Sequence, residues 1–239
     1  MPMTEFENEN AGGYGQFCPV AMAAEIVCRR WTALLLRELL AGSTRFNELR
    51  RGVPRMSPAL LSKRLKELQQ AGIIERRCEG DGGDAEYRLT PAGQDLREVV
   101  WSLGFWGQRW IEAQVSLKNL DPSLLMWDMR RNLDPTPLPP RRSVIHFQYP
   151  ELPAARRNWW LIVGKEGVDL CSVDPGFDVD LYVVADLKTM TAIWMGLASV
   201  GGEMASGRLL LTGDVGLQRS MQTWLGLSPF AKEKKRAAA

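Results

Sequence analysis

The chain has 239 residues, 45% of them hydrophobic and 24% charged, a composition typical of folded globular proteins and unlike that of disordered ones. It has no uncharged apolar run of about 18 residues, so we expect no transmembrane helix and no membrane partner. The acidic first 15 residues argue against a secretory signal peptide, which favours a cytoplasmic location with reduced cysteines. The four cysteines lack metal-ligand spacing and His146 is the single histidine, so we expect no metal and no cofactor.

The net charge of +2 is unevenly distributed along the chain. Between residues 45 and 78 there are nine basic residues against three acidic ones, Glu48, Glu67 and Glu75. The basic residues are Arg45, Arg50, Arg51, Arg55, Lys63, Arg64, Lys66, Arg76 and Arg77. Such an excess can attract the phosphate backbone of a nucleic acid. On charge alone, a solvated helical face remains the alternative.

Helical periodicity runs through the first half of the chain. It predicts helices over residues 19–29, 31–41 and 90–111, and a short helix capped by Ser43 or Thr44 that runs to about residue 51. Ser57 followed by Pro58 is a typical helix start, because the hydroxyl caps a free N–H and proline has none to cap. We therefore expect a helix over residues 57–70. Its buried face would carry Leu61, Leu65 and Leu68.

Two short strands are predicted before the last of these helices, over residues 73–78 and 86–90, with a glycine-rich hairpin tip at 80–83. The resulting order of helices and hairpin is that of a winged helix-turn-helix, in which residues 57–70 would be the recognition helix. The tip of the hairpin is acidic, which makes it a poor probe of the minor groove. Its acidic residues are Glu79, Asp81 and Asp84.

Ten residues are candidates for contact with double-stranded DNA. Small residues on the recognition helix allow close approach to the major groove, and lysines beside them can reach base edges or phosphates. Side chains at helix starts lie beside backbone N–H groups that favour a phosphate, and two arginines lie at the base of the hairpin. The candidates are Arg45, Arg55, Ser57, Pro58, Ala59, Ser62, Lys63, Lys66, Arg76 and Arg77.

An ordered set of short motifs between residues 17 and 113 resembles the HxlR-type winged helix regulators of bacteria. The motifs are Cys18-Pro19, Trp31, residues 45–49 (RFNEL), 61–68 (LSKRLKEL), 72–74 (GII) and 86–93 (EYRLTPAG). The resemblance implies a dimeric transcription factor that binds a pseudo-palindromic operator, with its terminal helices in the dimer interface. The sequence Cys28-Arg29-Arg30-Trp31 departs from the family, which usually has two glycines before a lysine-tryptophan pair.

Two further expectations concern single residues of this domain. Trp101, Trp106 and Trp110 are more tryptophans than one small-domain helix needs, and we expect them in a dimer interface, with packing against a second domain as the alternative.

Some members of the HxlR family sense oxidants through a cysteine near the start of the first helix, and Cys18 occupies that position. A thiol at a helix N-terminus can have a lowered pKa. The alternative for Cys18 is a buried structural thiol.

The second half of the chain follows a proline-rich stretch between residues 134 and 153 and mixes strands with helices. Strands are predicted over 144–149, 159–163, 168–173, 179–184 and 204–212, and helices over 187–195 and 217–225. From about residue 121 to residue 230 the chain resembles the sterol carrier protein domain. The resemblance is carried by residues 159–163, 168–170, 178–183, 186–190, 195–196 and 207–214. This resemblance implies a curved sheet with helices on one face and an apolar tunnel between them.

A methionine- and tryptophan-rich group would suit an apolar ligand of variable shape. The candidate ligand residues are Phe147, Trp160, Met190, Trp194, Met195 and Met204. A packed core is the alternative for each of them. Trp159 and Trp160 are neighbours in a strand, so their rings should face opposite sides of the sheet.

The sequence thus predicts a multidomain protein, a mainly α winged helix-turn-helix domain followed by an α+β sterol-carrier-like domain. The expected segments are a flexible tail (1–15), the DNA-binding domain (16–113), a linker with a leading helix (114–143), the second domain (144–230, or from 121 with its first helix) and a disordered tail (231–239). The function expected is a homodimeric DNA-binding regulator modulated by an apolar small molecule. The alternative is a lipid or acyl-ligand carrier whose winged helix is a scaffold. We find no nucleophile elbow, phosphate loop or carboxylate pair, and expect no enzyme.

Overall fold

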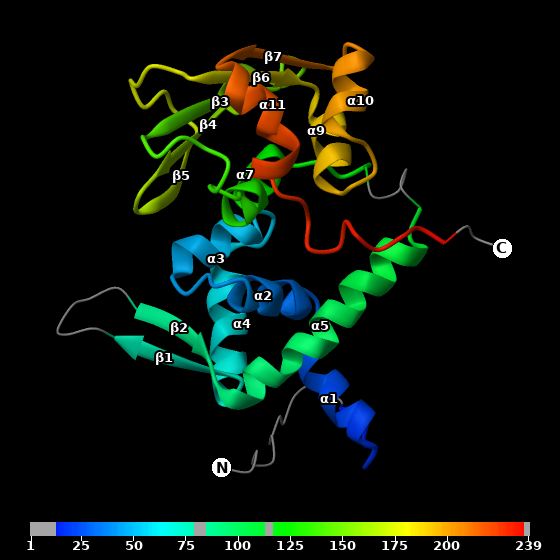
Figure 1. The fold of residues 1–239 in the computed structure, drawn as a ribbon. Coiled ribbons are helices and arrows are strands. Elements are labelled where there is room, and N and C mark those ends of the chain that lie inside the picture. The colour runs from blue at the N-terminus through cyan, green and yellow to red at the C-terminus, as the bar shows by residue number, and fades with distance from the viewer. Residues whose placement is uncertain (1–12, 79–84, 113–116, 237–239) are drawn as a thin grey trace. The chain divides into compact units, whose positions relative to one another are not determined.

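The computed structural model describes residues 13–78, 85–112 and 117–236, and the chain forms two compact units, Met1–Leu103 and Gly104–Ala239 (Figure 1). The boundary lies within a helix, ten residues before the one expected at residue 113, because the last turns of that helix pack with the second unit. Of the predicted tail over 1–15, residues 1–12 lie outside the described part. Within that part no helix is long and apolar enough to span a bilayer.

The first unit has the predicted order of elements, and its winged helix-turn-helix fold is confirmed. Its elements are α1 (Pro19–Val27), α2 (Thr32–Leu40), α3 (Phe46–Gly52), α4 (Pro58–Gln70), β1 (Ile74–Cys78), β2 (Ala85–Leu89) and the first part of α5 (Pro91–Trp110). The core joins leucines of α2 and α4 to Leu49 of α3 and Val100 of α5. The expected hairpin tip at 80–83 lies outside the described residues.

The ends of α4 are as predicted, whereas the start of α3 differs. Ser57 Oγ accepts a hydrogen bond from Leu60 N at 3.3 Å, and α4 ends before Gly72, whose φ of +66° favours glycine. The prediction that Ser43 or Thr44 caps α3 was wrong, because the cap residue is Arg45. The carboxylate of Glu48, three residues into the helix, accepts instead from Thr44 N (3.0 Å) and Arg45 N (3.1 Å).

An ion pair with a buried carboxylate connects α2 to the end of α3. Glu38 is fully buried, and Arg37 Nη2 donates to its Oε1 at 2.6 Å. The same nitrogen of Arg37 donates to Gly52 O at 3.2 Å, at the last residue of α3. A Cβ added at Gly52 would lie 1.9 Å from the Glu38 carboxyl group, so only glycine fits there.

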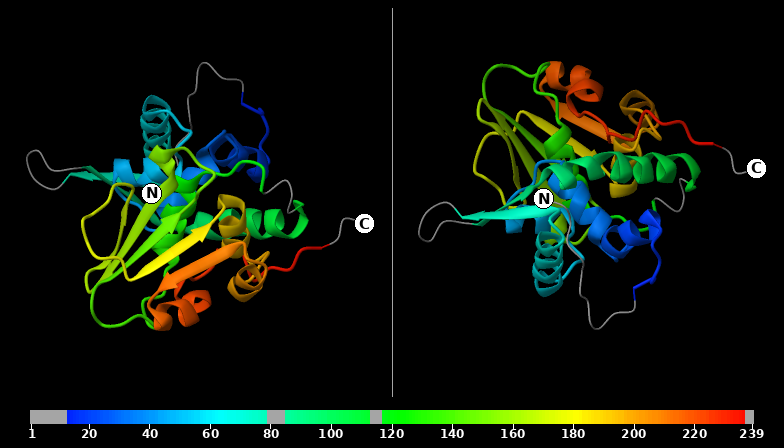
Figure 2. Two further views of the ribbon diagram at one scale, coloured as in Figure 1. Left: turned by 90° about the horizontal axis from the view of Figure 1, so that it is seen from above. Right: turned by 90° about the horizontal axis from the view of Figure 1, so that it is seen from below.

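The second unit contains a five-stranded sheet with strand order β5-β4-β3-β6-β7, in which β3 and β6 are parallel and the other neighbours antiparallel (Figure 2). The strands are β3 (Ser143–Gln148), β4 (Asn158–Gly164), β5 (Gly167–Cys171), β6 (Leu181–Ala185) and β7 (Leu209–Gly213). The helices are α7 (Pro122–Asn132), α8 (Ala154–Arg157), α9 (Leu187–Trp194), α10 (Val200–Ala205) and α11 (Val215–Trp224).

The predicted strand over 204–212 was wrong at its start, because residues up to Ala205 belong to α10. Ser199 caps this helix, with its Oγ accepting from Gly202 N at 3.1 Å. Apolar side chains alone did not separate the end of this helix from the strand that follows.

Alternate residues of the strands face two different environments, as their period of two requires. Phe147, Trp159 and Val183 belong to the core that the strands form with α7, α9 and α11. On the other side of the sheet, His146 stacks on Trp160 with ring centroids 4.3 Å apart, and its Nε2 lies 3.1 Å from Asn158 Oδ1. Burial lowers the pKa of His146. The tryptophan pair thus faces opposite sides of the sheet.

Candidate nucleic-acid interface

The outer face of α4 consists of small and basic residues. Three of the leucines of α4, at positions 61, 65 and 68, are buried in the core, as predicted. The opposite face is exposed and carries Pro58, Ala59, Ser62, Lys63 and Lys66, with Ser57 at its start. Side chains as small as alanine and serine allow close approach of the helix backbone to a partner surface.

The single acidic residue of α4 does not oppose these lysines. Glu67 is partly buried and forms ion pairs with Arg64 and with Arg29, the latter at 3.6 Å. All of α4 is described, and its exposed face bears no acidic side chain. The local positive charge of this face is therefore not cancelled within the helix.

Arg45, Arg55 and Ser57 lie exposed around the two helix starts. Arg45 begins α3 and forms an isolated bridge with Glu86 of β2, and Tyr87 N donates to Thr44 O at 2.8 Å. These contacts attach the start of α3 to the hairpin. Because Ser57 Oγ already accepts from Leu60 N, its O–H remains a donor for a phosphate oxygen.

The two arginines at the base of the hairpin differ in their surroundings. Arg77 Nη2 lies 2.5 Å from Glu75 Oε1 and Arg88 Nη2 lies 2.8 Å from Glu86 Oε2. The strand register places Glu75 opposite Arg88 and Arg77 opposite Glu86, so these four charges share one face and sum to zero. Arg76 lies opposite Tyr87 on the other face of β1.

Arg76 and Arg77 are neighbours in the sequence and were predicted to contact DNA together, whereas the cross-strand register places them on opposite faces of the hairpin. Arg76 is therefore the stronger candidate for DNA contact. The acidic tip residues Glu79, Asp81 and Asp84 lie outside the described residues.

The tryptophans of α5 are exposed to different degrees. Trp106 is 58% exposed and Trp110 44%, whereas Trp101 is half-buried against the core of the first unit. Val99 and Leu103, which sequence reasoning missed, are 45% and 56% exposed. Residues 99, 103, 106 and 110 follow the 4-3-4 spacing of one helix face, a signal that was present in the sequence.

The first helix also exposes apolar side chains. Val20 and Met22 of α1 are 76% and 57% exposed, and Phe17 just before it is 98% exposed. Exposed apolar residues in this number are typical of a surface that another chain covers.

Cys18 occupies the N-cap position of α1 and is half-buried. Hydrogen bonds from the backbone N–H groups of Ala21 and Val20 lower the pKa of its thiol below the ordinary value, because they stabilise the thiolate. The thiolate is the reactive form of cysteine. The N-cap position therefore favours the thiolate form of Cys18, and a role in oxidant sensing stays a prediction.

We expect Cys18 to react with iodoacetamide at neutral pH several times faster than Cys28, although Cys28 at the other end of α1 is the more exposed of the two. Mass spectrometry of alkylated peptides over a time course measures both rates in one sample. Slower alkylation of Cys18 than of Cys28 would contradict the proposed activation.

The six candidate ligand residues do not converge on one site. Phe147, Met190 and Trp194 belong to the packed core, and Met195 is half-buried against it. Trp160 lies on the opposite side of the sheet, stacked on His146.

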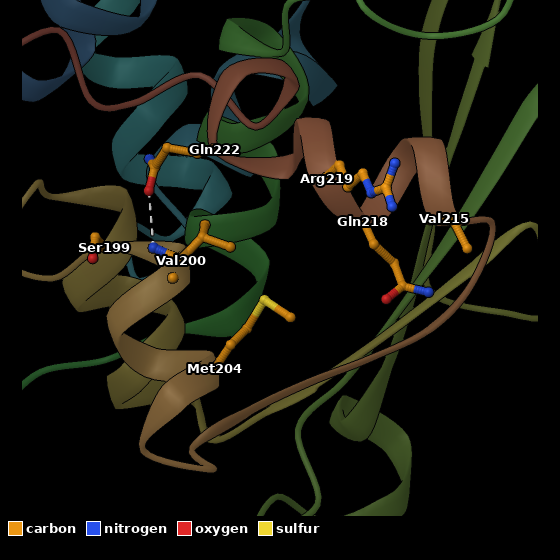
Figure 3. A pocket seen from close by; sticks show the side chains of 8 residues that line it. Ser199, Val200, Met204, Val215, Gln218, Arg219 and Gln222 are labelled. Atoms are coloured by element: carbon orange, nitrogen blue, oxygen red, sulfur yellow. Dashed lines mark hydrogen bonds between the residues drawn. The ribbon is translucent and has the colours of Figure 1, made fainter.

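Met204 alone of the six lines a cavity of about 520 Å³ beside α10 and α11 (Figure 3). The other lining residues are Ser199, Val200, Gly201, Val215, Gln218, Arg219 and Gln222. Gln222 Oε1 accepts from Val200 N at 2.8 Å at one side of this cavity and so joins α11 to α10. Within the described residues, no group of three histidine, cysteine or acidic side chains could hold a metal ion.

Residues 26–115 match the HxlR-like helix-turn-helix family. YvaP, an uncharacterized HTH-type transcriptional regulator of Bacillus subtilis, is 35% identical over 99 residues, which cover 41% of this chain and 92% of YvaP. The chain belongs to the HxlR family. A second relative, the uncharacterized HTH-type regulator Mb3122 of Mycobacterium bovis, is 41% identical over 95 residues, which cover 38% of this chain and 58% of Mb3122.

Among solved structures, the reduced form of the transcriptional regulator YodB from B. subtilis is 32% identical, with a TM-score of 0.35, and the match covers 39% of this chain and 93% of YodB. The relatives of this HxlR protein are named as transcriptional regulators, not enzymes. The family match ends at residue 115. The sterol carrier resemblance of the second half stays a prediction.

Proposed function

We propose that this HxlR family member is a transcriptional regulator that binds double-stranded operator DNA as a homodimer, with α4 in the major groove. The observation that carries the proposal is the exposed face of α4, which combines small residues with Lys63 and Lys66 and bears no acidic side chain along this fully described helix. A helix of this kind can approach base edges closely while its lysines contact bases or phosphates.

The residues around α4 would hold the phosphate backbone on either side of the groove. Arg45 and Ser57 lie at helix starts, where side chains and backbone N–H groups together favour an anion. Arg55 lies in the turn between these two helices, and Arg76 extends from β1 on the face away from the neutral charge cluster. Arg77, paired with Glu75, would contribute less.

A second copy of the chain is the proposed occupant of the apolar stripe on α5. The 4-3-4 spacing of Val99, Leu103, Trp106 and Trp110 is the spacing with which one helix packs along another. A dimer would present two copies of α4, as a pseudo-palindromic operator requires. Packing of this stripe against other parts of the same chain is the alternative.

We further propose that an apolar small molecule bound in the second unit modulates DNA binding. Support comes from the cavity lined by Val200, Met204 and Val215. The alternative function, a lipid or acyl-ligand carrier with the winged helix as a scaffold, predicts weak DNA binding without sequence preference. The basic face of α4 favours the regulator.

Fluorescence anisotropy tests the proposal with the full chain and two DNA duplexes, the sequence upstream of its own gene and a scrambled version. At physiological salt we expect the upstream duplex to bind at least about a thousandfold more tightly. Fatty or sterol-like compounds added to the same assay should then release the DNA. Equal, salt-sensitive binding to both duplexes and to further genomic fragments would contradict the regulator and favour the carrier.

A further inference from the structure

The segment after α11, residues 226–236, runs to the C-terminal end of α5, as the red part of the ribbon in Figure 1 shows. Disorder was predicted over 231–239, but residues 231–236 make specific contacts within the second unit. Residues 237–239 lie outside the described part of the chain.

This segment supplies the hydrogen-bond donors that the end of α5 lacks. The last carbonyl groups of an α-helix have no partner within the helix. Here Arg236 N donates to Arg109 O at 3.0 Å and Lys235 Nζ donates to Ile111 O at 2.5 Å. The lysine also places a positive charge at the negative end of the helix dipole. Arg109 Nε in turn donates to Glu233 Oε1 at 2.8 Å.

An aromatic contact packs the segment against the side of α5. The ring of Phe230 meets the ring of Phe105 edge-on, with centroids 5.4 Å apart and planes at 84°. The Phe230 ring occupies the space above Gly104, where an added Cβ would lie 2.3 Å from a ring carbon. A glycine inside a helix costs stability, so this one fits a site that needs close approach.

The same segment is attached to the end of α9. Ser228 N donates to Trp194 O at 2.9 Å. Gly196, with a φ of +71°, lies so close to Ala231 that an added Cβ would be 2.9 Å from the Ala231 Cβ. From α5 itself, Gln108 Nε2 donates to Met195 O at 3.2 Å. The last turns of α5 are thus connected to a helix whose Met190 and Trp194 lie in the core of the second unit.

We propose that residues 226–236 form a strap that caps α5 from a distant part of the chain and couples the end of α9 to the helix turns that carry Trp106 and Trp110. α5 is one continuous helix from Pro91 to Trp110, and its last turns carry Trp106 and Trp110 of the apolar stripe. Loss of the strap would leave the end of this helix uncapped, so these turns would fray. The effect on assembly rests on the homodimer of the proposed function, whereas the capping of α5 does not.

Gly104→Ala and Gly107→Ala are a matched pair of variants on this helix. Both raise helix propensity by the same amount, but only the Cβ at position 104 displaces Phe230, whereas at position 107 it meets nothing closer than the Ile111 Cδ1 at 3.6 Å. If helix propensity alone mattered, both variants would make α5 more stable. If the strap caps α5, Gly104→Ala makes the end of the helix less stable.

Hydrogen exchange of the full chain tests the capping directly, because it measures how well the amides at the end of α5 are protected. For Gly104→Ala we expect amides of residues 108–112 and 230–236 to exchange about tenfold or more faster than in the wild type. For Gly107→Ala we expect them to be unchanged or slower. Equal protection in the two variants would overturn the strap.

Sedimentation equilibrium measures whether loss of the strap weakens dimerisation. Gly104→Ala and a second variant, Phe230→Ala, should raise the dimer dissociation constant about tenfold or more, because an interface helix that must first be ordered loses affinity. The control Lys232→Ala/Lys234→Ala removes two exposed lysines of the same segment and should leave the constant unchanged. Faster exchange without weaker dimerisation would overturn the coupling. A wild type that is monomeric at all concentrations would overturn the coupling and the proposed homodimer together, with the capping still decided by exchange.

Discussion

Replacing Lys63 and Lys66 together by alanine is expected to weaken operator binding about thirtyfold at 0.15 M salt, because two lost phosphate contacts lower the salt slope by up to about two. Both side chains are exposed on a face of α4 to which this fully described helix contributes no acidic side chain, so nothing within the helix would compensate for their loss. Anisotropy titrations over a salt series give both the affinity and the slope.

Lys165→Ala/Lys188→Ala is the matched control for this variant. These lysines are also exposed, but they belong to the second unit, and their removal changes the net charge by the same amount. We expect the control to bind operator DNA with nearly the wild-type slope. If the two double variants lose the same affinity, the effect is one of net charge and α4 is not the recognition helix.

Gly52→Ala is expected to destabilise the first unit by about 3 kcal/mol, because it overpacks a site beside a buried ion pair. The new Cβ would lie 1.9 Å from the carboxyl group of Glu38. That carboxyl group cannot rotate away without breaking its 2.6 Å contact with Arg37, which also holds Gly52 O. Hydrogen exchange of the buried amides of α2 measures the loss.

Gly201→Ala is the control for this stability effect. Gly201 lies in α10, and an added Cβ there meets no atom within 4 Å. Alanine should therefore be neutral or stabilise that helix by up to about 1 kcal/mol. A Gly52→Ala protein as stable as the wild type would show that α3 can shift freely against Glu38.

The local parts of the fold were readable from the sequence. The start of α4 follows from Ser57 and Pro58, and its orientation follows from three leucines at helical spacing, because capping and periodicity depend on residues a few positions apart. The error at α3, where Glu48 and not Ser43 or Thr44 satisfies the first N–H groups, concerns the choice among several polar side chains within one turn. The error at residue 204 has a different origin, because apolar side chains occur both at the end of α10 and in the strand that follows it.

The residues of the candidate DNA interface were predictable from the sequence. Which of the basic residues nearby are paired with carboxylates was not. All ten predicted residues are exposed. That Glu67 turns toward Arg29, and that Arg77 but not Arg76 shares a face with two carboxylates, depends on pairing between separate elements. Sequence spacing contains no information on which of two neighbouring arginines meets an acid across a hairpin.

The sequence by itself determined the winged helix-turn-helix order, the start and buried face of α4 and the alternation of the sheet, because each depends on short-range periodicity and capping. Only the tertiary structure decided that the six candidate ligand residues divide between a core, a cavity and the opposite sheet face. It also decided that the tail caps α5, through contacts between residues 124 positions apart. Such contacts depend on how whole helices and strands pack, and short-range sequence patterns carry no information on that packing.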